Sequence, residues 1–323
     1  MTVLSVENLR VQFPSRHGTL TALDNVSLSI EPGEILGVVG ESGAGKSMTG
    51  LAVQGLLEPP GHIAGGAVVL NGRRIDGLPE AAMEKIRGRE IGAIFQDPLT
   101  SLNPLFTVGA QLVETIRLHL PMPRRAARER AVALLAEVGI PAPAERINHF
   151  PHQFSGGMRQ RVVIALALAA QPKLIIADEP TTALDVSIQA QITALLRRLC
   201  DEHGTAVMLV THDMGVIAET ADRVAVMYAG RMVEIGAVDQ VTRTPAHPYT
   251  RGLMGSIPAL GARVERLAQI DGAMPRLDAI PTGCAFNPRC PQAGARCRVD
   301  RPELAPAGAN LAACWLHQGG VDA

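Results

Sequence analysis

The stretch EILGVVGESGAGKS, residues 34–47, decides the fold of this 323-residue chain. It joins an apolar run of strand length, EILGVVG, to the pattern G-x-x-x-x-G-K-[ST], and a helical pattern follows. Glycines in such a loop let the backbone curl until several N–H groups face one phosphate group, and the next helix adds its positive N-terminal end. The stretch therefore predicts a strand, a phosphate-binding loop and a helix.

Two further apolar runs, KLIIAD at 173–178 and AVMLVTH at 206–212, also have strand length. Continuous apolar strands are typical of a parallel sheet that is buried on both faces. Helical patterns lie at 124–139, 157–171 and 186–204. Near the N-terminus, LSVENLRVQF and LTALDNVSLSIEPG alternate more, which predicts an antiparallel β layer. The expected fold class is α/β.

Changes of pattern predict the domain organisation. Residues from about 98 to 170 show helical patterns without a strong strand, which predicts a helical subdomain. From Pro245 onward, prolines and glycines recur every few residues and periodicity disappears. We therefore expect one domain at 1–240 and a loop-rich C-terminal extension at 241–323.

Composition narrows the class of protein. With 47% hydrophobic residues the chain can bury a core, and its net charge of -1 argues against a general electrostatic grip on nucleic acid. The N-terminal residues have neither a basic leader nor an apolar block, and the longest apolar run, 162–170, is far shorter than the roughly 20 residues that span a bilayer. These features predict a soluble, cytoplasmic protein without a nucleic-acid partner.

A nucleotide site is expected around the phosphate-binding loop. Lys46 would reach the β and γ phosphates, and the Ser47 hydroxyl would bind Mg²⁺. Asp178 ends the second apolar run and would place a carboxylate beside that Mg²⁺, while Glu179 is well placed to activate a water. The loop residues expected to bind the nucleotide are Gly40, Glu41, Ser42, Gly43, Ala44, Gly45, Lys46 and Ser47.

Two other candidates are ambiguous from the residues alone. Gln96, in IFQDP, either bridges the metal and the water or belongs to a surface turn. His212 ends the third apolar run, where it either contacts a γ-phosphate or packs at a strand end.

The stretch FSGGMRQR, residues 154–161, opens a long apolar helix and predicts a second anion-binding helix N-terminus with Ser155 as its N-cap. Here the chain resembles the ATP-binding cassette (ABC) family, and six motifs follow in that family's order. They are Gly40–Ser47, Gln96, Ser155–Gln160, Asp178 with Glu179, TTALD ending at Asp185, and His212.

The resemblance implies a P-loop NTPase cassette with a mixed core sheet, an antiparallel β layer and a helical subdomain. It implies that Asp178 binds Mg²⁺, Glu179 is the catalytic base and His212 is the switch histidine. Gln96 would contact Mg²⁺ and link the nucleotide state to a membrane partner. Phe13 is the candidate for stacking on adenine. The residues expected to meet the ATP of an opposite subunit are Ser155, Gly156, Gly157, Gln160 and Asp185.

Phe154 and Met158 depart from the common signature, and this variant is similar to the D-type ATPase of oligopeptide and dipeptide importers. AHPYTRGLMGSIP and PTGCAFNPRC strengthen that likeness. The implied protein hydrolyses ATP at the cytoplasmic face of the inner (plasma) membrane, as a peripheral subunit. Implied partners are a second ABC ATPase in a heterodimer, two membrane-spanning permeases and an extracellular substrate-binding protein. Nickel, glutathione or another cargo, or a soluble non-transport ABC protein, are the alternatives.

Four of the five cysteines lie in the extension, at Cys284, Cys290, Cys297 and Cys314. Thiolates in this number can bind zinc or an iron–sulfur cluster, although pairs two to four residues apart, typical of zinc ribbons, are missing. Free or disulfide-linked thiols are the third possibility. The D-type resemblance implies a [4Fe-4S] cluster with a structural role. Cys200 lies in an apolar helical stretch and is expected in the core.

Overall fold

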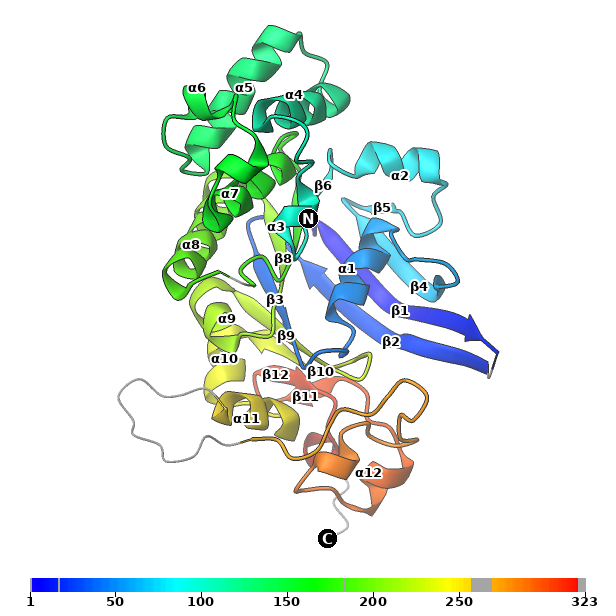
Figure 1. Cartoon of the computed structure of the whole chain (residues 1–323). Helices are drawn as coiled ribbons and strands as arrows, with labels where there is room; N and C mark the ends of the chain where they lie inside the picture. Colours follow the sequence, from blue (N-terminus) through cyan, green and yellow to red (C-terminus); the bar gives the residue numbers. More distant parts are fainter. Residues whose placement is uncertain (1, 17, 183, 257–268, 319–323) are drawn as a thin grey trace. The chain divides into compact units, whose positions relative to one another are not determined.

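The computed structural model describes residues 2–16, 18–182, 184–256 and 269–318. The chain forms two compact units. Unit 1 contains Glu31–Glu34 and Gly77–Leu209, and unit 2 contains Thr2–Ile30, Ile35–Asp76 and Val210–Ala323. Figure 1 labels most of their helices and strands. Within the described residues, no helix has both the length and the apolar character needed to cross a membrane.

Unit 2 contains the predicted antiparallel β layer. Its strands lie in the order β2-β1-β4-β5. They are β1 (Leu4–Ser15), β2 (Gly18–Ile30), β4 (His62–Leu70) and β5 (Arg73–Arg74). Leu4 pairs with Ile30 on one side and with Leu70 on the other, and all three side chains are buried. Alternate apolar residues along β1 thus form one buried face, as the sequence pattern predicts.

A second set of strands in unit 2 follows the order β11-β12-β10-β9-β3. They are β3 (Ile35–Val39), β9 (Arg223–Tyr228), β10 (Arg231–Ala237), β11 (Ala305–Ala307) and β12 (Asn310–Ala312). β3 runs parallel to β9, while β10 is antiparallel to both β9 and β12. The C-terminal extension therefore contributes two strands, which its proline-rich and glycine-rich sequence does not reveal.

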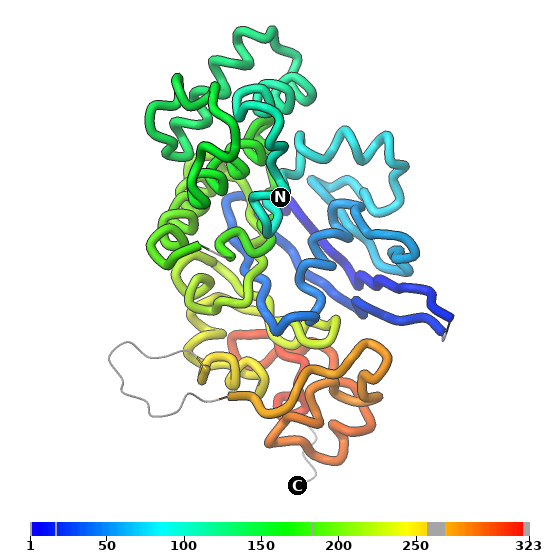
Figure 2. The backbone as a smooth tube through the Cα atoms, in the orientation of Figure 1, coloured from blue at the N-terminus to red at the C-terminus, as the bar shows by residue number. Residues whose placement is uncertain are grey.

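The remaining elements of unit 2 are short. They are α1 (Lys46–Gln54), α9 (Met214–Thr220), α10 (Val238–Arg243), α11 (Pro248–Gly255), η2 (Asn287–Arg289), α12 (Ala295–Val299) and η3 (Trp315–His317). Between 269 and 318 the backbone is mostly irregular and is interrupted by single helical turns (Figure 2). This part of the chain cannot rely on long helices for its stability.

Buried polar contacts attach the extension to the rest of unit 2. Glu234 on β10 is fully buried, and its carboxylate accepts hydrogen bonds from the N–H groups of Ala246 and His247 and from the Asn310 amide, at 2.8, 2.9 and 2.9 Å. A carboxylate without such donors would be very costly at this depth. Glu234 therefore links the start of the extension, at Ala246 and His247, to Asn310 on strand β12, in the last part of the extension.

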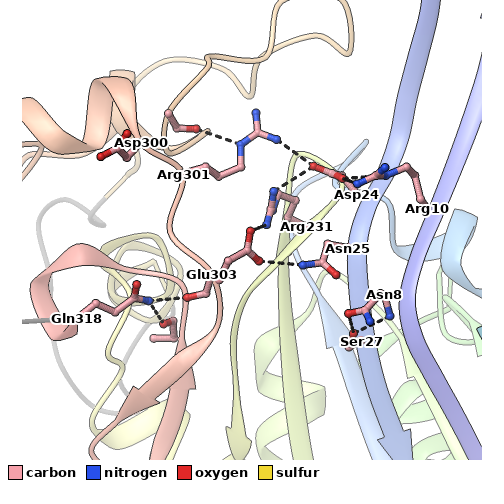
Figure 3. Close-up of polar contacts among 12 residues, drawn as sticks. Asn8, Arg10, Asp24, Asn25, Ser27, Arg231, Asp300, Arg301, Glu303 and Gln318 are labelled. Carbon is pink, nitrogen blue, oxygen red and sulfur yellow. Dashed lines mark hydrogen bonds and ion pairs between the residues drawn. The ribbon is translucent and has the colours of Figure 1, made fainter. Parts of the chain in front are cut away.

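A second group of charges joins the extension to the β layer (Figure 3). Asp24 on β2 accepts from Arg231 at 3.0 Å and from Arg301 of the extension at 2.9 Å. Arg10 contacts the other oxygen of Asp24 at 3.2 Å. Arg231 also pairs with Glu303 at 2.7 Å. One carboxylate thus gathers three guanidinium groups from distant parts of the chain.

Unit 1 contains strands β6 (Ile91–Ile94), β7 (Leu174–Asp178) and β8 (Ala206–Val210) in the order β8-β7-β6. β6 and β7 are parallel. Its helices are α2 (Glu80–Ile86), α3 (Pro98–Ser101), α4 (Val108–His119), α5 (Arg124–Glu137), α6 (Pro143–Arg146), η1 (Pro151–Gln153), α7 (Gly156–Ala167) and α8 (Val186–His203). The helices predicted at 124–139, 157–171 and 186–204 are confirmed.

Candidate functional site

The phosphate-binding loop follows β3 in unit 2 and adopts backbone conformations that favour glycine. Gly40, Gly43 and Gly45 have φ of 153°, 82° and 106°. A Cβ on Gly40 would lie 2.3 Å from the Met227 carbonyl oxygen, and one on Gly45 would lie 2.7 Å from Leu23 Cδ2. Both distances are shorter than the contacts that a Cβ atom makes in folded proteins. The loop thus needs glycine at these positions for its curvature and its packing.

Lys46 begins helix α1 and is only 6% exposed. Its ammonium donates to the carbonyl oxygens of Gly40 at 2.8 Å and Glu41 at 3.1 Å. The loop therefore surrounds its own lysine, and the N-terminus of α1 lies at the same place. Backbone N–H groups, a helix N-terminus and an ammonium together form an anion-binding cradle.

Glu179 lies just beyond β7 in unit 1. It has a positive φ of 46°, an uncommon conformation for this residue type. Its Oε2 atom accepts hydrogen bonds from Thr182 Oγ1 at 2.8 Å and from Gln96 Nε2 at 3.3 Å. Gln96 follows β6, so the parallel pairing of β6 and β7 brings Gln96 and Glu179 to the same edge. The structure thus joins two predicted catalytic residues and adds Thr182, for which no role was predicted.

Ser155 is the N-cap of α7, as predicted, and its Oγ accepts from the Met158 N–H at 3.4 Å. Ser155 and Gly156 are exposed, whereas Gly157 packs closely: a Cβ there would lie 2.7 Å from Ile188 Cγ2. Gln160 is 1% exposed, and its amide nitrogen has no hydrogen-bond partner among the described residues. The N-terminus of α7, at Ser155 and Gly156, is therefore exposed to solvent.

Asp185 also has a local structural role. Its Oδ1 accepts from the Ile188 N–H at 3.0 Å and caps α8. Its side chain is exposed, as the carboxylate of a cap residue commonly is.

Phe13 and His212 belong to unit 2. Phe13 is half-buried near the end of β1, where its ring packs so closely on Gly61 that a Cβ on this glycine would lie 2.5 Å from Phe13 Cε1. His212 is exposed, and Asp213 after it caps α9. Unit 2 thus holds the phosphate-binding loop, Phe13 and His212, and unit 1 holds Gln96, the 155–160 segment, Asp178, Glu179 and Asp185.

Metal sites receive no direct support from side-chain geometry. In the part of the chain that the structure describes, no group of three or more His, Cys, Asp or Glu side chains could hold a metal ion. Of the predicted Mg²⁺ ligands, Ser47 lies in unit 2 and Gln96 and Asp178 in unit 1. The magnesium ligands therefore stay a prediction.

The four cysteines of the extension nevertheless line one cavity, together with Phe286 and His247. The volume of this cavity is about 20 Å³. Burial, with the three other thiols nearby, raises the pKa of Cys284 to about 11. Burial also raises the pKa of Cys290 and of Cys314. Cys200, by contrast, is fully buried in α8, which confirms its predicted place in the core.

Two family models match the chain. The ABC transporter model matches residues 23–182, and a model described as the C-terminal region of oligopeptide/dipeptide transporters matches residues 233–297. The chain belongs to the ABC transporter family. The second match covers the segment with three of the four clustered cysteines.

Curated relatives of this ABC protein match nearly its whole length. The dipeptide transport ATP-binding protein DppD of Escherichia coli is 46% identical over 304 residues, which are 94% of this chain and 93% of the relative. DppD of Bacillus subtilis is 47% identical over 98% of this chain and 95% of the relative. The oligopeptide transport ATP-binding protein OppD of Escherichia coli is 48% identical over 97% and 93%.

Solved structures confirm the predicted ABC cassette fold. A dimeric ATP-binding cassette in a post-hydrolysis state with bound ADP and phosphate matches 73% of this chain and 98% of its own, with 31% identity and a TM-score of 0.65. CbiO1 from Clostridium perfringens, part of an ABC transporter complex, matches 75% and 91%, with 28% identity and a TM-score of 0.66. These matches and the family membership confirm the predicted ATPase activity.

Proposed function

We propose that this chain is the ATP-hydrolysing subunit of an importer for dipeptides or oligopeptides. The observation that supports this most is the phosphate-binding loop around a buried Lys46, in a chain whose near full-length relatives are peptide-transport ATP-binding proteins. The relatives' names favour peptides over nickel or glutathione as cargo.

The proposed mechanism assigns binding and hydrolysis to different residues. The loop N–H groups and Lys46 bind the β and γ phosphates of ATP, and Phe13 stacks on adenine. Glu179 accepts the proton of the attacking water, while its hydrogen bonds from Thr182 and Gln96 fix the carboxylate in place. His212 contacts the γ-phosphate from the end of β8.

Mg²⁺ fits the oxygen donors that the chain supplies. Ser47, Gln96 and Asp178 would hold it, since hydroxyl, amide and carboxylate oxygens are the ligands that this hard cation prefers. When bound, it neutralises negative charge that builds up on the phosphates.

The signature segment is proposed to serve a second ATPase subunit. Ser155 and Gly156 are exposed at the N-terminus of α7, a helix of twelve residues whose end favours an anion. Gln160 lies one turn further, and its buried amide nitrogen has no hydrogen-bond partner in the part of the chain that the structure describes. We propose that these residues, with Gly157, bind the γ-phosphate held by the partner ATPase, and that Asp185 contributes to the contact across the heterodimer.

Exposed apolar side chains next to Gln96 favour a membrane-protein partner. Leu99, Leu105 and Phe106 are 63%, 79% and 54% exposed. Large exposed apolar side chains that gather in one segment of a globular protein favour an interaction surface. We propose that the permease pair docks here, so that the chain works as a peripheral subunit at the cytoplasmic face of the membrane, with an extracellular binding protein delivering the peptide.

For the extension we propose a [4Fe-4S] cluster, held by Cys284, Cys290, Cys297 and Cys314. The four thiols line one cavity, and four thiolates are the ligand set that a [4Fe-4S] cluster takes. The cluster would stabilise a segment with few long helices. Zinc is the alternative.

Metal analysis of anaerobically purified protein tests this assignment. Brown protein with iron and sulfide in equal amounts, both lost in Cys290→Ser, is the expected result. Colourless protein with one zinc per chain would replace the cluster by zinc, and metal-free protein would remove both.

Reconstitution of the complex tests the transport function. The chain, co-expressed with two permeases and a second ATPase encoded beside it, should co-purify with them from membranes. ATP turnover should rise when peptide-loaded binding protein is added, and Lys46→Ala should abolish that rise while leaving the complex assembled. A chain that hydrolyses ATP but never associates with membrane subunits would favour the soluble, non-transport alternative.

A further inference from the structure

Arg289 connects the cysteine-bearing loop of the extension to the phosphate-binding loop inside unit 2. Its side chain is 6% exposed, although its charge would normally keep it in water. The guanidinium donates through Nη1 to both carboxylate oxygens of Glu41, each at 3.0 Å, and to the Tyr228 hydroxyl at 3.3 Å. Its other nitrogens donate to the carbonyls of Asp271 at 2.8 Å and Ile270 at 3.2 Å. A buried arginine with this many partners is held in one position.

Glu41 is the second residue of the phosphate-binding loop. Its backbone N–H donates to the Tyr249 hydroxyl at 2.9 Å, and its carbonyl accepts from the Lys46 ammonium. Its carboxylate is a negative charge next to a cradle for phosphates. Unless a positive charge compensates it, this carboxylate repels an incoming nucleotide. Arg289 supplies that compensation from a position 248 residues further along the chain.

Three aromatic rings pack around the contact between Arg289 and Glu41. Tyr228 and Tyr249 lie edge to face at 4.7 Å, and Phe286 packs against them at 5.3 and 5.4 Å. Arg289 lies 5.8 Å from the centre of the Tyr228 ring and 5.9 Å from that of Phe286. The three rings therefore hold the guanidinium and the Glu41 backbone in one cluster.

The cysteine cavity shares Phe286 with this cluster. Phe286 and Arg289 belong to the short segment between Cys284 and Cys290, and Phe286 also lines the cavity. Two hydrogen bonds fix this segment. The Cys284 N–H donates to the Cys297 carbonyl at 2.8 Å, and the Asn287 side-chain amide donates to the Cys284 carbonyl at 2.7 Å. Phe286 and Arg289 therefore share one short, hydrogen-bonded segment with Cys284 and Cys290.

We propose that the cysteine-bearing loop sets the ATP affinity of the phosphate-binding loop through Arg289, which neutralises Glu41. Arg289 is a positioning residue in this account, since it acts on the nucleotide through Glu41. The inference rests on the proposed ATPase function and adds a regulatory link between the cysteine site and the ATP site. No nucleotide has to touch the extension for this link to work.

Calorimetric titration of the full chain with Mg²⁺ and ATPγS tests the proposal. Arg289→Met should weaken binding about tenfold, because an uncompensated charge near the phosphates costs on the order of a tenfold change in affinity. Arg289→Lys should recover part of the loss. The double variant Arg289→Met with Glu41→Gln should recover most of it, because the repelling charge is gone.

Arg301→Met is the matched control. Arg301 also belongs to the extension and also bonds a carboxylate of unit 2, Asp24 (Figure 3). Its other hydrogen bonds among the described residues go to the carbonyls of Gly283 and Pro281, outside the phosphate-binding loop. Its loss should leave the affinity within about twofold of wild type, well below the tenfold step expected for Arg289. Equal loss in Arg301→Met would mean that a loosened extension, and not the Arg289 charge, lowers the affinity, and would overturn the proposal.

Two further outcomes would also overturn it. Unchanged affinity in Arg289→Met would show that Glu41 needs no compensation. Unchanged affinity in Cys290→Ser, for which we expect a loss smaller than that of Arg289→Met, would show that the cysteines do not control Arg289. Wild-type protein that binds no ATPγS would instead contradict the proposed function, and Lys46→Ala fixes the background for that comparison.

Discussion

The phosphate-binding loop and the Glu179 turn differ in where their supporting contacts come from. The loop depends on Tyr249 and Arg289, which lie more than two hundred residues further along the chain. Glu179 depends on Thr182, three residues away, and on Gln96 at the end of the neighbouring strand. Substitutions far from the motifs should therefore alter ATP binding, whereas the position of the Glu179 carboxylate should respond mainly to residues of unit 1.

Outside the Glu179 turn itself, the largest effect is expected at the signature segment. Ser155→Arg places a long cation at the exposed N-terminus of α7, where the proposed partner nucleotide binds. ATP turnover of the assembled complex should fall by about 100-fold or more, as for the loss of a main transition-state donor. Binding of ATPγS to the isolated chain should stay close to wild type. Equal loss of binding in the isolated chain would show that Ser155 serves the nucleotide of its own subunit.

Lys46→Ala should affect ATP binding by the phosphate-binding loop. Loss of an ammonium that binds phosphates removes a charge-assisted hydrogen bond, so ATP affinity should drop by about 10- to 100-fold. Titration of the isolated chain measures this directly, and the fold is expected to survive because the carbonyls of Gly40 and Glu41 can bind water instead. Unaltered affinity would remove Lys46 from the binding site.

A smaller, purely structural effect is expected at Glu234. Glu234→Ala leaves three buried donors without their acceptor, which should lower the free energy of unfolding by on the order of 3–5 kcal/mol. Glu303→Ala is the matched control, since this carboxylate is 62% exposed and its ion pair should contribute less than about 1 kcal/mol. Denaturant unfolding compares the two, and similar losses in both would contradict the role given to Glu234.

Local patterns predicted much of this molecule. The strand, loop and helix around Lys46 were predicted because their signals lie within fourteen consecutive residues. The capping role of Ser155 followed from the residue type in front of a helical pattern. Thr182 lies in a quoted motif, but nothing in that motif indicates that its hydroxyl bonds Glu179.

Contacts between residues far apart in the sequence could not be predicted, because local patterns carry no information about them. No pattern pairs Arg289 with Glu41, because a charge alone does not select its partner across 248 residues. Strands β11 and β12 are three residues each, too short to show alternation. Four cysteines in the extension predict a shared site. Their spacing does not indicate that Arg289, which lies between Cys284 and Cys290, contacts Glu41 of the phosphate-binding loop.

In the proposed mechanism ATP binding and ATP hydrolysis are separable functions of this subunit, and Glu179→Gln tests this separation most directly. Affinity for ATP and steady-state turnover should be measured on one sample of the assembled complex. We expect affinity close to wild type and turnover lower by about 100- to 10,000-fold, because glutamine can hold the water but cannot accept its proton. Turnover near wild type, or loss of ATP binding in parallel with turnover, would contradict the account.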